Sequence, residues 1–91
     1  MEESFGDFVL FVRRLLDTVG YQLEVNDRGR KYYKLIMDKG SQKSVWCFVD
    51  KETGEIFKPV TWKAPARHSR GNVLNPESYR DYVWTGPPYL R

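Results

Sequence analysis

Four β-rich stretches with very short connections dominate the first two thirds of the chain, and they constrain its fold more than any other feature. Residues 21–25, 30–37, 44–50 and 55–60 are rich in β-branched and aromatic side chains, with turn-forming residues between them. Connections this short favour antiparallel pairing of neighbouring strands, because a parallel crossover needs a dozen or more residues. The pattern therefore predicts a four-stranded antiparallel meander over about residues 21–60.

An amphipathic helix is predicted ahead of these strands. Over residues 5–19 apolar side chains recur at three- and four-residue spacing, Ser4 is a suitable N-cap, and Gly20 is a suitable stop. Leu10 and Phe11 widen the apolar surface beyond one stripe. We expect this surface to be buried under the sheet, and a homodimer contact through the helix is the alternative.

The remainder of the chain has less regular patterning. Residues 61–74 show neither helical nor strand periodicity and are interpreted as an irregular basic segment. Asn75 followed by Pro76 is typical of a helix start, which predicts a short helix over about residues 76–84. Tyr89 and Leu90 are expected to hold the tail against the body. The predicted fold is thus a single α+β domain over residues 1–91.

Composition excludes several classes of protein. With 41% hydrophobic residues among 91, the chain has enough apolar material for one packed core and too little length for two. The acidic start MEESFGDF does not resemble a signal peptide, and no apolar run is long enough for a membrane span. Cys47 is expected to be a buried, reduced thiol, since a single cysteine forms no internal disulfide. One cysteine and one histidine predict no metal site, and no cofactor is expected.

Charge is unevenly distributed along the chain, whose formal net charge is +3. Residues 56–75 contain four bases and no acid, namely Lys58, Lys63, Arg67 and Arg70. Such asymmetry favours an anionic partner, and a solvated surface with acids nearby in space is the alternative.

The basic segment combines groups that suit a phosphate-bearing ligand. Trp62 could stack on a base, and Arg67 and Arg70 could direct their planar guanidinium groups at one phosphate. Gly71 and Asn72 are expected to form a tight turn whose amides point at an anion. The predicted ligand-binding residues are Lys58, Trp62, Lys63, Arg67, His68, Arg70 and Asn72.

His68 is the one candidate catalytic residue, because only its side chain exchanges protons near neutral pH. A small phosphodiesterase or nuclease could use it, but such an enzyme needs a second acid–base group. Asp50, Glu52, Tyr32 or Tyr33 would have to lie close to it in the fold. A ligand contact and a structural role remain open for His68.

Residues 45–73 carry a specific pattern of Phe-Val-Asp, a glycine turn, Lys-Pro and a Trp-x-Ala-Pro-Ala-Arg-x-x-Arg-Gly-Asn stretch. This pattern resembles a group of small proteins of tailed bacteriophages, cyanophages among them, which have no assigned activity. The resemblance rests on Phe48, Val49, Asp50, Gly54, Lys58, Pro59, Trp62, Ala64, Pro65, Ala66, Arg67, Arg70, Gly71 and Asn72. It implies a viral origin and an intracellular or virion role, and we expect the protein in the cytoplasm of the infected bacterial cell.

The sequence thus predicts an accessory protein that binds nucleic acid or a nucleotide through the basic segment. The main alternative is a binder of a host or virion protein, with Leu10, Phe11 and the aromatic stretch from Tyr82 to Leu90 as its contact surface. The second alternative is the phosphodiesterase or nuclease that uses His68.

Overall fold

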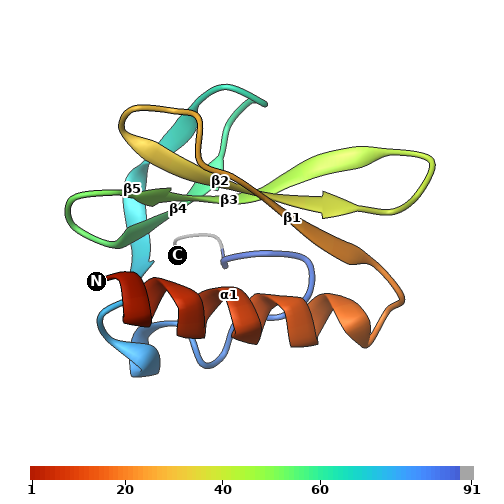
Figure 1. The fold of residues 1–91 in the computed structure, drawn as a ribbon, viewed down its shortest axis with the longest axis horizontal. Coiled ribbons are helices and arrows are strands. Elements are labelled where there is room, and N and C mark those ends of the chain that lie inside the picture. The colour runs from red at the N-terminus through yellow and green to blue at the C-terminus, as the bar shows by residue number, and fades with distance from the viewer. Residues whose placement is uncertain (89–91) are drawn as a thin grey trace.

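The structure, a computed structural model, describes residues 1–88 of the chain. One helix precedes five strands, and all neighbouring strands pair antiparallel in the order β1-β2-β3-β4-β5 (Figure 1). The elements are α1 (Glu2–Asp17), β1 (Gln22–Asn26), β2 (Tyr32–Asp38), β3 (Lys43–Asp50), β4 (Glu55–Pro59), β5 (Pro65–Asn72) and a 3₁₀ helix (Pro76–Ser78). The predicted α+β class is confirmed.

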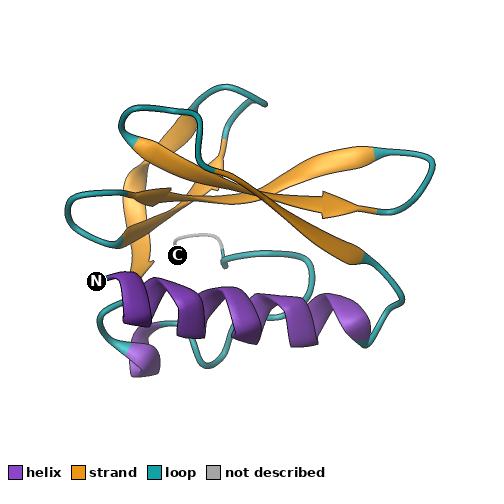
Figure 2. Ribbon diagram, viewed as in Figure 1, coloured by secondary structure: helices purple, strands orange, loops and turns teal. Residues whose placement is uncertain are grey.

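Helix α1 lies along one face of the sheet, and the chain after β5 passes beside it on the same side (Figure 2). Phe8, Val12 and Leu16 are fully buried and form one stripe of the helix. They pack in a cluster that includes side chains from the sheet and from residues 73–82. The core therefore occupies one face of the sheet, and within residues 1–88 no helix lies over the other face.

The register of the strands shows which side chains occupy each face. Tyr33 stacks on Phe5 of α1 with ring centroids 4.0 Å apart, so it points toward the helix. Its neighbour Tyr32 contacts Phe48 instead, at 5.8 Å between centroids, and Phe48 pairs with Lys34 across the β2–β3 ladder. Because alternate residues of a strand point to opposite faces, Tyr32, Lys34 and Phe48 lie on the face away from the helix. We call this face the open face.

The four predicted strands are present, but the prediction of only four was wrong. Residues 65–72, which we expected to be irregular, form β5 at the edge of the sheet. The register of β5 against β4 is interrupted at two places, so its side chains do not follow a clean alternation. Backbone pairing forms this strand, and a pattern of apolar side chains could not predict it.

The bounds of the predicted helices also differ from the structure. Helix α1 already begins at Glu2, so Ser4 lies inside it and is not the N-cap. The helix expected over residues 76–84 is a single 3₁₀ turn, although Asn75 does cap it by accepting a hydrogen bond from the Glu77 amide at 3.2 Å. The chain leaves the helical conformation at Tyr79.

Packing against α1 explains why this helix is so short. The Tyr79 and Tyr82 rings both contact the Phe8 ring, at 4.8 and 6.5 Å between centroids. Beyond them, Trp46 donates a hydrogen bond from Nε1 to the Trp84 carbonyl oxygen at 2.7 Å. The segment thus follows the core through successive turns, in which the Tyr82 amide donates to the Tyr79 carbonyl oxygen and the Gly86 amide donates to the Val83 carbonyl oxygen. The expected packing of Tyr89 and Leu90 lies outside the described residues.

Two expectations from the sequence, a buried Cys47 and no membrane-spanning segment, concern residues 1–88. Cys47 is fully buried, as predicted, and burial raises the pKa of its thiol. No helix in this part of the chain has the length and apolar character needed to cross a bilayer.

Candidate functional site

The sequence-predicted site residues do not converge on one place. Lys58 is half-buried, and its ammonium donates a hydrogen bond to the Pro87 carbonyl oxygen at 2.6 Å. Burial and the nearby Arg70 lower the pKa of Lys58. Arg70 itself donates from Nε to the Pro88 carbonyl oxygen at 3.0 Å and from Nη1 to the His68 carbonyl oxygen. These two cations therefore hold the segment after the 3₁₀ helix against the sheet.

Gly71 and Asn72 have structural contacts of the same kind. Both lie in β5 and do not form the expected tight turn. The Asn72 side chain donates to the Thr53 carbonyl oxygen at 3.0 Å and accepts from the Leu74 amide at 2.8 Å. Arg67 and His68 are exposed on the same strand. Of the predicted residues, Trp62 and Lys63 remain, in the loop between β4 and β5.

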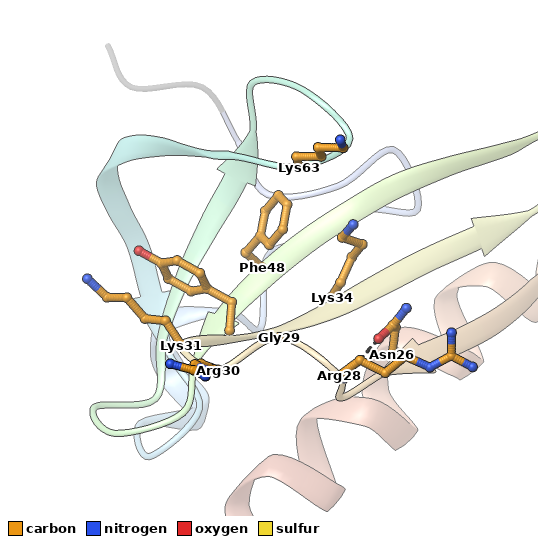
Figure 3. A pocket seen from close by; sticks show the side chains of 9 residues that line it. Asn26, Arg28, Gly29, Arg30, Lys31, Lys34, Phe48 and Lys63 are labelled. Carbon is orange, nitrogen blue, oxygen red and sulfur yellow. Dashed lines mark hydrogen bonds between the residues drawn. The ribbon is translucent and has the colours of Figure 1, made fainter.

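Lys63 lines a pocket of about 360 Å³ on the open face, which we call the basic pocket. It is formed by the end of β1 and the loop that follows it, by the strands β2 and β3, and by the loop between β4 and β5. Of the nine described residues that line it, five are basic and none is acidic. The five bases are Arg28, Arg30, Lys31, Lys34 and Lys63 (Figure 3).

Aromatic side chains form the floor of the basic pocket. In Figure 3 the Phe48 ring lies in the middle, with Lys63 above it and Lys31 and Lys34 on opposite sides. The Lys34 ammonium lies 5.8 Å from the Phe48 ring centroid and 4.9 Å from that of Trp62. Such cation–π contacts hold the ammonium in place beside the two rings.

The loop that carries three of the bases is held from two directions. Asn26 accepts a hydrogen bond from the Arg28 amide at 2.9 Å, which starts the turn. The Lys51 ammonium donates to the carbonyl oxygens of Asp27 and Gly29 at 2.5 and 2.6 Å. The backbone of residues 27–29 is thus fixed by a cation that does not line the pocket itself, and the side chains of Arg28 and Arg30 are directed outward from an ordered loop.

A neighbouring hollow contains carboxylates and is less suited to an anion. Arg30 and Lys31 border it together with Asp50 and Glu52. Burial acts to raise the pKa of Asp50, but amide hydrogen bonds from Thr53 and Glu52 and the charge of Lys31 outweigh it and leave that pKa lowered. Asp50 is therefore ionised at neutral pH and serves as the acceptor of a turn, so the excess of positive charge lies in the basic pocket.

Four of the five bases were not among the predicted site residues, although they form a basic cluster in the sequence. The stretch NDRGRKYYK, residues 26–34, contains Arg28, Arg30, Lys31 and Lys34 around two tyrosines. We interpreted its first part as a turn and its second part as a strand. The turn is present, but β2 begins only at Tyr32, so Arg30 and Lys31 lie in the loop and not in the predicted strand. Neither interpretation shows that the loop folds over the open face toward Lys63.

The residues proposed for contact with another protein are divided between surface and core. Leu10 is 47% exposed on α1, whereas Phe11 packs on Tyr79 with ring centroids 5.0 Å apart. Tyr82 is buried, and its hydroxyl donates to the Arg70 carbonyl oxygen at 2.8 Å. The aromatic residues of this segment that the structure describes thus contribute to the core.

The fold and the site define a class: a small α+β protein in which one helix covers one face of an antiparallel sheet and a basic, aromatic-floored pocket lies on the other. The chain belongs to a family of unknown function (DUF7717), whose profile matches residues 12–89. All residues of the basic pocket lie within that range. No curated protein and no solved structure is significantly similar to the chain.

Proposed function

We propose that this protein is a binding module for a phosphate-bearing ligand, a nucleic acid or a nucleotide, which it holds in the basic pocket. The observation that carries the proposal is that five basic residues, four from residues 28–34 and Lys63 from the loop between β4 and β5, line one pocket with no acid among its described lining residues. Asp50 and Glu52 border Arg30 and Lys31 in the neighbouring hollow, and a bound anion would offset the repulsion among the other cations of the pocket.

The chemistry of the pocket suits phosphate better than an isolated carboxylate. Arg28 and Arg30 offer planar pairs of donors that match phosphate oxygens, and Lys34 and Lys63 add point charges. Phe48 and Tyr32 supply an apolar surface between them, which suits a ligand with a sugar or a base attached to its phosphate. From the resemblance to tailed-bacteriophage proteins, which itself implies no activity, we propose the host cytoplasm as the place where the ligand is bound.

Paired charge removals test this location. Binding of a fluorescein-labelled oligonucleotide and of ATP would be measured for the wild type, Arg28→Gln/Arg30→Gln and Arg67→Gln. We expect the pocket double variant to lose about tenfold or more in affinity at ~0.1 M salt, since each lost phosphate contact removes a counterion-release contribution. Arg67→Gln is expected to retain most of the affinity.

A matched control separates the pocket from net charge. Arg13 and Arg14 are exposed on α1, so Arg13→Gln/Arg14→Gln removes the same charge at a distance from the basic pocket. Equal losses in both double variants would contradict a specific pocket, and a loss confined to Arg67→Gln would return the site to β5. Absence of binding to either ligand by the wild type at low salt would refute the proposal.

A further inference from the structure

Trp62 is an exposed aromatic side chain beside the basic pocket. Trp62 is 46% exposed, and the Lys34 ammonium lies 4.9 Å from the centroid of its ring. Lys34 also lines the basic pocket, so the Lys34–Trp62 contact forms a boundary of that pocket. Packing of the protein core does not explain why so large an indole is exposed on the surface of so small a protein.

A second hollow adjoins Trp62 on the open face. It has a volume of about 310 Å³, and its lining consists of Val45, Pro59, Val60 and Trp62 together with the polar residues Lys43, Ser44 and Thr61. Val45 pairs with Ile36 across the ladder, and Val60 is 69% exposed. Charged residues dominate the first pocket, whereas this hollow, which we call the apolar hollow, offers hydrocarbon next to an indole.

The loop between β4 and β5 directs consecutive residues into the two hollows. Trp62 lines the apolar hollow, and Lys63 lines the basic pocket. The loop is ordered by short contacts: the Thr61 hydroxyl accepts from the amides of Lys63 and Ala64 at 3.2 and 3.1 Å, and the Val60 amide donates to the Ala64 carbonyl oxygen at 2.9 Å. The indole and the ammonium are therefore presented together by one fixed turn.

We propose that the ligand is a single-stranded nucleic acid, with phosphates in the basic pocket and a base stacked at Trp62 toward the apolar hollow. This inference rests on the proposed function and narrows its ligand class. A single strand alternates charged phosphates with free base faces, which matches a cationic pocket followed by an exposed indole. A duplex hides its base faces within its own stack, and a mononucleotide such as ATP carries a single base, so it does not alternate phosphates with bases along the pocket.

Substitution of Trp62 separates stacking from charge. Anisotropy of a fluorescein-labelled single strand of about 15 nucleotides, near the upper end of site sizes for one small domain, would be compared with that of a duplex of the same length. We expect Trp62→Ala to weaken single-strand binding about fivefold to a hundredfold, and Trp62→Phe to restore most of it. Duplex binding, which uses charge alone, should not change.

The outcomes distinguish this inference from the proposed function. Equal affinity for single strand and duplex, with no effect of Trp62→Ala on either, would overturn the single-strand inference. If Arg28→Gln/Arg30→Gln still weakened both ligands in that case, the proposed function would stand. Failure of all nucleic acids to bind at low salt would overturn both. Because Trp62 is exposed, we expect its variants to fold, and circular dichroism would verify this.

Discussion

At the scale of single residues, Gly71 occupies a position in β5 with no room for a side chain. A methyl group there would lie 2.7 Å from the Tyr82 hydroxyl oxygen and 3.1 Å from the Ser78 carbonyl oxygen. The Tyr82 hydroxyl is fixed by its hydrogen bond to Arg70, so it cannot move away without losing that contact. The glycine thus permits close approach of β5 to the segment after it, and it has no role in an anion-binding turn.

Gly71→Ala is therefore expected to lower the free energy of unfolding by about 1–3 kcal/mol, the usual cost of overpacking. Gly6 is the control, because it lies in α1 with no atom within 4 Å of an added methyl group. Gly6→Ala should stabilise the protein by about 0.5–1 kcal/mol, since alanine favours a helix. Urea unfolding of both variants measures this contrast, and equal effects would show that packing at Gly71 is not tight.

At the scale of elements, the loop between β1 and β2 depends on Lys51, which lies in the turn between β3 and β4. Lys51 donates to two carbonyl oxygens of this loop, and its ammonium also lies 5.0 Å from the Tyr33 ring centroid. The loop in turn carries Arg28, Arg30 and Lys31 to the basic pocket. Lys51 is a positioning residue, since it lines no part of that pocket.

Lys51→Met should weaken oligonucleotide binding about threefold to tenfold, because binding must then order the loop. Amide hydrogen exchange of residues 27–31 should become faster in this variant. Lys39→Met removes the same charge at the opposite end of β2 and should change neither quantity. Equal losses of affinity in both variants, without faster exchange, would mean that only net charge is affected.

The elements differ in how far the sequence could predict them. Strands β1 to β4 follow from β-rich stretches with short turns, and α1 follows from its apolar stripe. Strand β5 could not be predicted, because its pairing is a backbone property of an edge with interrupted register. In the basic pocket residues 26–34 lie near Lys63. This proximity results from the order of the strands in the sheet, which no local sequence pattern predicts.

At the scale of the whole molecule, a buried thiol and two buried phenol groups determine how the free energy of unfolding changes at alkaline pH. Burial raises the pKa of Cys47, Tyr79 and Tyr82. Groups with a raised pKa keep their proton more firmly in the folded state, so their contribution is complete below the unfolded pKa and is lost above it. Lys58, whose pKa is lowered by burial and by Arg70, opposes this trend.

We therefore expect constant stability from pH 7 to about 8.5, where an unfolded cysteine begins to ionise, and a steeper fall above about pH 10, where unfolded tyrosines ionise. Each group contributes a slope of up to about 1.4 kcal/mol per pH unit. Urea unfolding at several pH values measures the curve, and Tyr82→Phe should reduce its slope above pH 10. A protein equally stable at pH 7 and pH 11 would contradict this account of burial.

The central claim for the whole molecule is that five cations gathered on the open face bind phosphates. The most direct test is the salt dependence of single-strand binding, measured by anisotropy from about 50 to 200 mM NaCl. Five contacts predict a slope of about −3.5 in log K against log salt, and Arg28→Gln/Arg30→Gln should reduce it to about −2.1. Arg13→Gln/Arg14→Gln should leave the slope unchanged. A slope near zero in the wild type, or the same slope in the pocket variant, would contradict the claim.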